Sequence, residues 1–171
     1  LEIVDEQDKV IGIETRDNIH QQGLLHREIH IWVKNDKGEI LFQRRSPTKD
    51  TYPNLLDASV GGHVEPGMTY EATAVKEMKE ELGLSVNIKD IQFVRKTRTK
   101  GIDKSTGSTN NTFSKIFIYK LQSCDNLVLE KGKATALEFW SVRQLQNLTE
   151  DQKKSFIFTP LKNALEIFSK C

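Results

Sequence analysis

GGHVEPGMTYEATAVKEMKEELGL, residues 61–84, decides the fold expected of this chain. It opens with a glycine pair and a Pro-Gly turn, continues as a helix, and ends at Gly83, a residue type that favours the left-handed helix terminus. Glu77, Glu80 and Glu81 are spaced i, i+3 and i+4, so they share one helix face. We expect the apolar stripe on the opposite face to pack against a core; its members are Ala72, Val75, Met78 and Leu82.

The three glutamates repel one another. Like charges at i,i+4 destabilise a helix by roughly a few tenths of a kcal/mol, and Lys76 and Lys79 offset only part of this. A divalent cation such as Mg²⁺ prefers carboxylate and phosphate oxygens and would offset the repulsion more fully. A solvated helix face is the alternative interpretation, but the glycine loop before the helix favours metal binding.

This stretch resembles the Nudix box, G-x5-E-x7-R-E-U-x-E-E-x-G-U, in which U is a bulky apolar residue. Met68 replaces the first glutamate of that pattern, and Lys76 replaces its arginine. The resemblance implies an α/β (α+β) fold, a Nudix-type α/β/α sandwich with a mixed β-sheet. The matching positions are Gly62, Glu77, Met78, Glu80, Glu81, Gly83 and Leu84.

The resemblance also implies a metal site that uses Mg²⁺ or Mn²⁺. A fourth carboxylate often completes such a site from outside the box, and Glu130 is our candidate because it precedes the EFW segment by a short loop; Glu138 is the alternative. The expected metal ligands are Gly62 through its carbonyl oxygen, Glu77, Glu80, Glu81 and Glu130.

The catalytic residues expected from the resemblance are Glu77, Glu81 and Lys76. We favour Glu77 as the base that takes a proton from water, held by the neighbouring Lys76. Lysine keeps the charge of the usual arginine but lacks its planar fork. Glu81→Gln should therefore reduce kcat far more than Glu71→Gln, because Glu71 flanks the box near the helix N-terminus.

The preceding segment, residues 20–60, resembles the isopentenyl-diphosphate-isomerase-like branch of the Nudix superfamily through HREIHIWV, QRRSPTK and NLLDASVGGH. In the isomerases the positions matching Arg45 and Lys49 hold the substrate diphosphate. An arginine fork with a lysine point charge suits phosphate oxygens. Arg44 is a further candidate, although solvated cations at a strand end are the alternative for each arginine.

The isomerases also hold a metal with histidines at positions that resemble His20, His26 and His63, together with two acidic residues from a later strand. Residues 109–113 carry no acidic pair, so we expect ordinary structural or surface histidines here. Gly61 stands where the isomerases have a catalytic cysteine. Isomerisation would therefore lack one of its proton donors.

Three functions follow from these observations. The first is a metal-dependent Nudix hydrolase that cleaves the P–O–P bond of a nucleoside-diphosphate-linked or other X-diphosphate. The second is a catalytically weak module that binds a nucleotide or diphosphate, which Met68 and Lys76 favour. The third is the isomerase, which Gly61 argues against. Trp32, Tyr52 and Phe113 could stack on a base, but each is equally consistent with a core position.

Composition bounds the class of protein. With 171 residues, 29% charged and 37% hydrophobic, we expect one soluble domain over residues 1–171. A net charge of +1 gives no reason to expect a nucleic-acid polymer as partner, and no apolar run approaches the roughly 18 residues of a membrane span. No leader is evident, and Cys124 and Cys171 lack metal or redox spacing, so we expect a reduced, cytoplasmic protein. The oligomeric state, a homodimer included, stays open.

The flanking segments predict the remaining elements from apolar periodicity and turn residues. Expected are a hairpin over 1–16, a short helix or loop after the cap Asp17, strands over 24–34 and 39–45, one or two strands within 85–99 (86–88, then 91–97), a mobile loop over 100–112, strands over 113–121 and 137–142, a helix capped by Ser141, and a C-terminal helix after Pro160.

Overall fold

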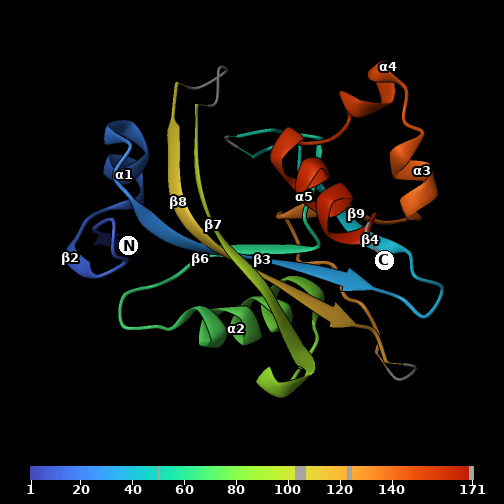
Figure 1. Cartoon of the computed structure of the whole chain (residues 1–171), viewed down its shortest axis with the longest axis horizontal. Helices are drawn as coiled ribbons and strands as arrows, with labels where there is room; N and C mark the ends of the chain where they lie inside the picture. Colours follow the sequence, from blue (N-terminus) through green and yellow to red (C-terminus); the bar gives the residue numbers. More distant parts are fainter. Residues whose placement is uncertain (50, 103–106, 123–124, 170–171) are drawn as a thin grey trace.

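The computed structural model describes residues 1–49, 51–102, 107–122 and 125–169 (Figure 1). Its strands are β1 Glu2–Val4, β2 Val10–Ile13, β3 His26–Lys34, β4 Ile40–Arg45, β5 Leu56–Asp57, β6 Val60–His63, β7 Ile91–Ile102, β8 Thr109–Lys120 and β9 Ala134–Trp140. Its helices are α1 Arg16–Gln22, α2 Tyr70–Leu82, the 3-10 turn η1 Ile88–Asp90, α3 Val142–Gln146, α4 Glu150–Lys153 and α5 Phe158–Phe168.

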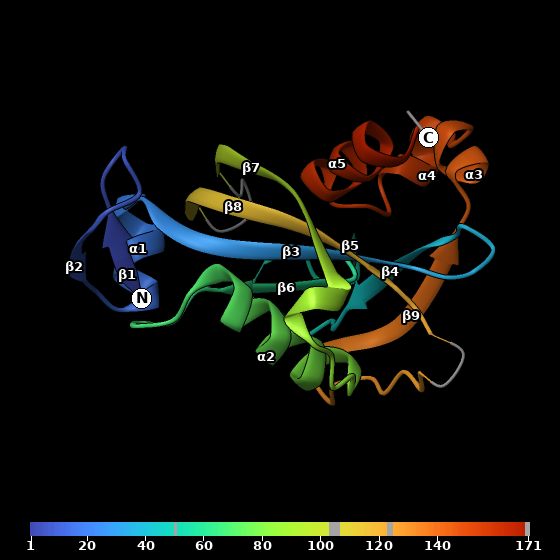
Figure 2. The ribbon, with the colours of Figure 1, turned by 60° about the horizontal axis from the view of Figure 1, so that its bottom comes forward.

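Strand β3 organises a mixed sheet. It pairs in parallel with β8, from His26 opposite Thr112 to Lys34 opposite Lys120, and antiparallel with β1, β4 and β6. Strand β4 extends the sheet to β5 and β9, and β7 forms an antiparallel pair with β8. Helix α2 covers one face, and α3 and α5 lie on the other (Figures 1 and 2). The expected sandwich with a mixed sheet is confirmed.

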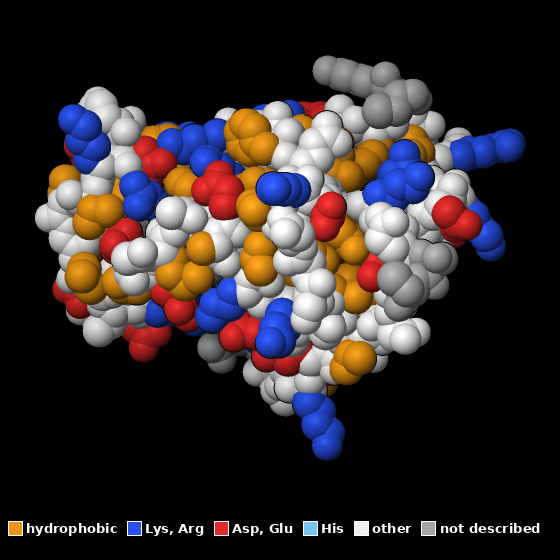
Figure 3. Space-filling view, turned by 90° about the horizontal axis from the view of Figure 1, so that it is seen from below, with side chains coloured by type: hydrophobic (Ala, Val, Ile, Leu, Met, Phe, Trp, Pro, Cys, Tyr) orange, Lys and Arg blue, Asp and Glu red, His pale blue; other side chains and the backbone are white. Residues whose placement is uncertain are grey.

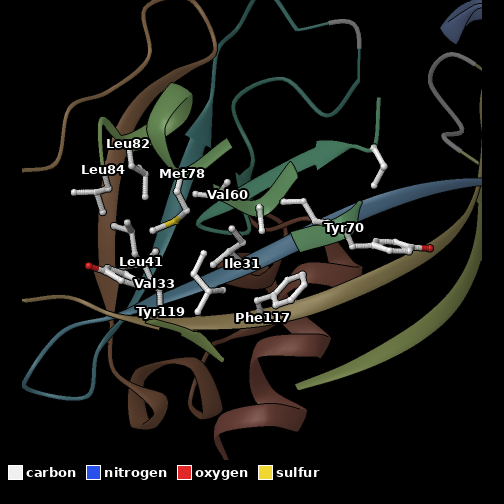
Figure 4. Close-up of a cluster of buried hydrophobic side chains, with 14 residues drawn as sticks. Ile31, Val33, Leu41, Val60, Tyr70, Met78, Leu82, Leu84, Phe117 and Tyr119 are labelled. Carbon is white, nitrogen blue, oxygen red and sulfur yellow. The ribbon is translucent and has the colours of Figure 1, made fainter. Parts of the chain in front are cut away.

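Side-chain alternation divides the core between the two faces of the sheet. Along β3, Ile31 and Val33 pack toward α2, whereas Trp32 between them packs toward α3 and α5. Along β8, Phe117 and Ile116 divide in the same way. Figure 4 shows the cluster beneath α2, where strand and helix side chains interdigitate. The helix that carries Glu77, Glu80 and Glu81 is thus fixed to the centre of the sheet.

Helix α2 ends at Gly83, as the sequence predicts. Its N-cap Thr69 accepts a hydrogen bond from the Ala72 amide, and Gly83 ends it with φ 71°. Of the predicted core stripe, Met78 and Leu82 are buried and the half-buried Val75 packs against the same cluster, whereas Ala72 is exposed. The buried face consists of Tyr70, Thr73, Ala74, Glu77, Met78, Glu81 and Leu82. Two of the three box glutamates therefore lie on the buried side, where their charges need partners.

The N-terminal predictions are mostly confirmed. The hairpin forms as β1 and β2, and the helix after it is capped by Thr15 rather than by Asp17. Thr15 has the extended backbone of an N-cap, and its hydroxyl accepts a hydrogen bond from the Asn18 amide. Ser141 caps α3 in a capping box, as expected.

Of the one or two strands expected within 85–99, the structure has one, β7, because Asn87 caps the turn η1 where the other strand was placed. The loop expected over 100–112 is wrong. The polar segment 100–112 is largely strand: β7 continues to Ile102, and β8 starts at Thr109. Cross-strand pairing with β8 overrides the loop-like composition. Residues 103–106, and likewise Cys124 and Cys171, lie outside the described residues.

Among the described residues, no helix is both long and apolar enough to cross a membrane. On the face that Figure 3 shows, lysine and arginine side chains are interspersed with aspartate and glutamate side chains. This face therefore presents no single-sign field of the kind that attracts a polyanion.

Candidate functional site

A cavity of about 570 Å³ opens beside Glu77 of α2 and the ends of several strands. Its volume lies within the range of small-molecule sites. Two groups of ionisable residues meet it: the box side, with Glu77, Arg45, Lys49 and Lys133, and the histidine side, with His20, His63 and Glu28. Residues that line the cavity include Arg16, His20, Glu28, His30, Arg45, Lys49, Tyr52, Asp57, Gly61, Gly62, His63, Glu77, Asn110 and Lys133.

Gly62 allows Glu77 to lie directly over strand β6. A Cβ atom at Gly62 would stand 2.5 Å from the Glu77 Cδ and 2.6 Å from its Oε1. Only glycine leaves this space, so the box glycine and the box glutamate form one unit. Gly62, whose carbonyl is the expected metal ligand, pairs with Ile29 of β3 in the antiparallel register of β6.

Lys133, which stands just before β9, sits among the box carboxylates. Its Nζ lies 2.6 Å from Glu81 Oε1, 3.4 Å from Glu77 Oε2 and 3.6 Å from Glu130 Oε2. Gln43 of β4 donates to the other oxygen of Glu81 and to the Ser59 carbonyl. Burial raises the pKa of the Glu81 carboxyl, against the opposing effect of the Lys133 ammonium. The box side thus holds its negative charge by pairing it.

Glu130 lies next to the box, as predicted. Its amide donates to the Glu81 carbonyl at 3.3 Å, and its Oε2 is buried with no hydrogen-bond partner among the residues that the structure describes. Glu138, the alternative, is instead paired with Arg44 at 2.6 Å. A buried carboxylate oxygen beside two buried glutamates is a donor set that suits a hard divalent cation. The residues present therefore fit the metal that the resemblance implies.

Glu80 and Lys76 lie at the outer edge of this group. Lys76 Nζ lies 3.0 Å from Glu65, 3.1 Å from Glu80 and 3.7 Å from Glu77. The Glu80 side chain is 49% exposed, in contrast to the buried Glu77 and Glu81. Lys76 therefore reaches Glu77 as expected, but it is shared among three carboxylates.

The adjacent arginines Arg44 and Arg45 diverge, as alternation along a strand requires. Arg45 lines the cavity, donates to the Thr51 carbonyl at 3.0 Å and contacts Asp57 at 3.0 Å. Lys49 also lines the cavity; burial, with Lys133 and Arg45 nearby, lowers its pKa. Arg44 is engaged with Glu138 and is not among the cavity-lining residues, so the structure brings only two of the three predicted phosphate ligands together.

Met68, which replaces the first glutamate of the box, is partly buried against the core cluster beneath α2. A thioether at this position contributes packing where the pattern has a carboxylate. The replacement therefore removes one acidic group from the box and adds an apolar contact.

On the histidine side, three imidazole rings converge. The ring centroids of His20, His26 and His63 lie 5.0–5.3 Å apart, and their ligand nitrogens lie within 4.8 Å of one another. His26 is fully buried, and its Nε2 has no hydrogen-bond partner among the described residues. The three could hold a metal ion, although we expected ordinary structural or surface histidines.

Beside these rings lies Glu28 of β3, a buried carboxylate. Thr112 donates to it at 2.8 Å, Ser114 also donates to it, and its Oε1 lies 4.0 Å from His30 Nε2. Strand β8 thus supplies hydroxyls rather than an acidic pair at this point. Burial raises the pKa of Glu28, but His30 and the hydroxyl donors outweigh it, so the net pKa is lowered and the carboxylate stays ionised.

The histidines themselves are kept neutral. Burial lowers the pKa of His20 to about 4, with the neighbouring His26 adding to the effect. Burial also lowers the pKa of His26 and of His63, for which the Glu28 charge acts in the opposite direction. Neutral imidazole nitrogens are able to accept hydrogen bonds or bind a metal ion.

The three aromatic candidates lie in three different surroundings. Trp32 is fully buried in the core. Phe113 lies under the Lys96 ammonium, 4.5 Å from its ring centroid. Tyr52 lines the cavity and is 38% exposed, so it is the candidate placed to stack on a ligand.

Sequence reasoning missed Gln43, Lys133 and Glu28. Gln43 had a signal, because it stands two residues before Arg45 on one strand and therefore shares its face. Lys133 and Glu28 had none, since each meets its partners only through contacts between distant segments.

Comparison with known proteins defines the class. The NUDIX domain family matches residues 24–161, which is most of the chain. This chain therefore belongs to the Nudix family. An uncharacterised Nudix hydrolase from a Nostoc species is 44% identical over 95 residues, covering 55% of this chain and 56% of that protein. The chain spans about half the length of the curated relatives it matches.

Solved structures show the same fold. A Deinococcus radiodurans protein, DR0079, matches with a TM-score of 0.69 and 23% identity, covering 100% of this chain and 98% of that one. The NUDIX domain of Shewanella oneidensis NrtR, solved with ADP ribose, matches with a TM-score of 0.61 and 11% identity over 85% of this chain and 86% of that one. At these identities the likeness concerns the fold.

Proposed function

We propose that this chain is a metal-dependent hydrolase that cleaves the P–O–P bond of a nucleoside-diphosphate-linked or other X-diphosphate. The observation that carries the proposal is the meeting of two charge types at one cavity. Buried box carboxylates and the cations Arg45 and Lys49 line or border the same space. Carboxylates suit a divalent cation, and the cations suit the phosphates of the substrate.

The metal site would consist of Glu77, Glu80, Glu81, Glu130 and the Gly62 carbonyl. Bound there, Mg²⁺ or Mn²⁺ would supply Lewis-acid stabilisation of the charge that develops on phosphate oxygens. Membership of the Nudix family supports this assignment, as does the buried Glu130 Oε2, which accepts no hydrogen bond from the described residues and has the Lys133 ammonium 3.6 Å away.

Residues of the chain would bind the substrate, accept the proton and orient the base. Arg45 and Lys49 hold the diphosphate and fix the reacting phosphorus against the box. Glu77 accepts the proton of the attacking water, because it is the buried box glutamate that lines the main cavity. Water attacks phosphorus, the bond to the bridging oxygen breaks, and two phosphorylated products leave. Lys76 orients Glu77 from 3.7 Å.

The substrate X is best sought by turnover. Nucleoside diphosphates and triphosphates, nucleotide sugars, dinucleotides, ADP ribose and isoprenoid diphosphates would be incubated with Mg²⁺, with Mn²⁺ or with chelator. A phosphatase specific for monoesters would convert the products to inorganic phosphate. ADP ribose belongs in the panel because the structurally similar Shewanella domain binds it. Metal-dependent release that Glu81→Gln lacks would support the hydrolase and begin to name X.

A ligand-binding module is the second candidate. It is favoured by Met68, which removes a box carboxylate, and by Lys133, whose ammonium contacts Glu81. No release from any substrate, together with a ligand that raises the melting temperature, would favour this module over the hydrolase. The isomerase is disfavoured because Gly61, which lines the cavity, carries no thiol.

A further inference from the structure

The position of Lys133 has a consequence for metal binding. Its main chain is fixed: the amide donates to the Glu130 carbonyl at 3.3 Å, and the carbonyl accepts from the Ser46 amide at 3.1 Å. Gly132 before it has φ 82°, which allows the tight turn into β9. Only the side chain, with its four-carbon stem, is free to take more than one direction.

The ammonium group and a divalent cation compete for the same oxygens. Lys133 Nζ lies 2.6 Å from Glu81 Oε1 and within 3.6 Å of oxygens of Glu77 and Glu130. Mg²⁺ needs oxygen ligands at roughly 2.0–2.1 Å, and its charge would repel an ammonium so close by. The lysine side chain must therefore turn away when the carboxylates bind a metal ion.

The cavity offers the displaced ammonium a defined destination. Lys133 lines the cavity together with Arg45 and Lys49, the two cations expected to hold phosphates. Beside Arg45 and Lys49, a third positive charge is repelled when the cavity holds no anion, but it is attracted when a diphosphate is bound. Metal binding would thus move one positive charge from the box toward the substrate.

We propose that Lys133 is an exchangeable counterion: it neutralises the box carboxylates until a divalent cation displaces it, and it then binds the substrate phosphates beside Arg45 and Lys49. The second half rests on the proposed hydrolase function. The first half concerns metal and protein alone, and it is tested without substrate.

The first test is a calorimetric titration of Mn²⁺ into the wild-type chain, Lys133→Met and Lys131→Met. Lys131→Met is the matched control, because this exposed lysine lies two residues away and its loss changes net charge equally. Lys133→Met should bind Mn²⁺ about tenfold more tightly, within the usual range of coupling between two sites. Lys131→Met should bind like wild type. Equal or weaker binding by folded Lys133→Met would overturn the proposal.

A measurement on the wild-type chain covers the case in which Lys133→Met does not fold. Acetylation of lysines would be followed by mass spectrometry with and without Mg²⁺. The reactivity of Lys133 should rise severalfold with Mg²⁺, whereas that of Lys131 should stay constant. A Lys133 reactivity that Mg²⁺ leaves unchanged would contradict the exchange.

The phosphate half is tested by kinetics at saturating Mg²⁺. Lys133→Met should raise KM for the substrate about tenfold and change kcat less, and Lys133→Arg should restore most of the affinity. An unchanged KM would overturn this half. If the wild-type chain turns over no substrate, the hydrolase proposal fails, while the Mn²⁺ titration still decides whether Lys133 exchanges with metal.

Discussion

The two sides of the cavity meet the same physical difficulty in opposite ways. On the box side, Glu77 and Glu81 are buried, and Lys133 supplies a cation at 2.6–3.4 Å. On the histidine side, His20, His26 and His63 are kept neutral by burial. Taking an ion out of water costs several kcal/mol, so a buried group must be either paired or uncharged. A carboxylate paired with a lysine can exchange that lysine for another cation. A neutral imidazole instead keeps a nitrogen lone pair that can accept a hydrogen bond or bind a metal ion.

The largest expected effect comes from removing a charge on the box side. Glu81→Gln should lower kcat by roughly 100-fold to 10,000-fold, because it removes a carboxylate proposed to hold the metal ion, whose stabilisation of developing charge is worth several kcal/mol. Glu71→Gln, the matched control on the same helix, removes a carboxylate that pairs with Lys115 at 2.7 Å. It should change kcat less than about twofold. Steady-state kinetics on the best substrate measures both, and similar losses would refute the assignment.

Substitutions at the two neighbouring glycines would disturb different sides of the cavity. Gly62→Ala would place a Cβ 2.5 Å from Glu77 and displace its carboxylate, whereas Gly61→Ala would meet His30 at 3.3 Å. We expect Gly62→Ala to lower kcat about 10-fold to 100-fold, because a displacement of this size misplaces a reacting group. Gly61→Ala should lower it less than about threefold. A greater loss in Gly61→Ala would shift the catalytic centre toward the histidines.

The adjacent arginines provide a finer comparison. Arg45→Met should raise KM about tenfold, as loss of a charged hydrogen-bonding partner would. Arg44→Met removes a half-exposed ion pair with Glu138 and an exposed hydrogen bond to the Asn54 carbonyl, so KM should stay constant and stability should fall by about 1 kcal/mol. Kinetics and chemical denaturation of both variants measure these effects. A KM increase in Arg44→Met alone would reverse the assignment.

The smallest expected effect is a difference in pH dependence. Because folding lowers the histidine pKa values, for His20 from 6.5 to about 4, the unfolded chain binds more protons within that window. The histidines should therefore lower the free energy of unfolding as the pH falls from 7 to 5. Glu81 acts in the opposite direction: its raised pKa contributes stability at low pH that is lost as the pH rises.

Urea denaturation in chelator at several pH values measures this balance. His63→Asn should flatten the loss of stability on acidification, and Glu81→Gln should steepen it, since it removes the opposing contribution. Equal slopes in both variants and wild type would show that neither side governs the pH dependence.

Much of the fold and part of the site could be predicted from local sequence. The Thr69 cap region, Gly83 and the i,i+4 pair of Glu77 and Glu81 are fixed within one helix, so spacing alone places them. The loop predicted over residues 100–112 was wrong because composition describes a segment in isolation. Most of that segment instead pairs with a neighbouring strand. The burial of Glu77 and Glu81 on α2 could not be predicted from the helix alone. Carboxylates are seldom buried without partners, and the partners of these two lie elsewhere in the chain.

By itself, then, the sequence determined the box helix, its glycine loop and the pair of glutamates that it carries, since these depend on neighbours a few residues apart. Tertiary structure alone decided which groups surround them. Gln43 meets Glu81 across 38 positions and Lys133 meets Glu77 across 56, while three histidines from different segments converge opposite. Such contacts follow from how strands pair and pack, because burial and charge act through space rather than along the chain.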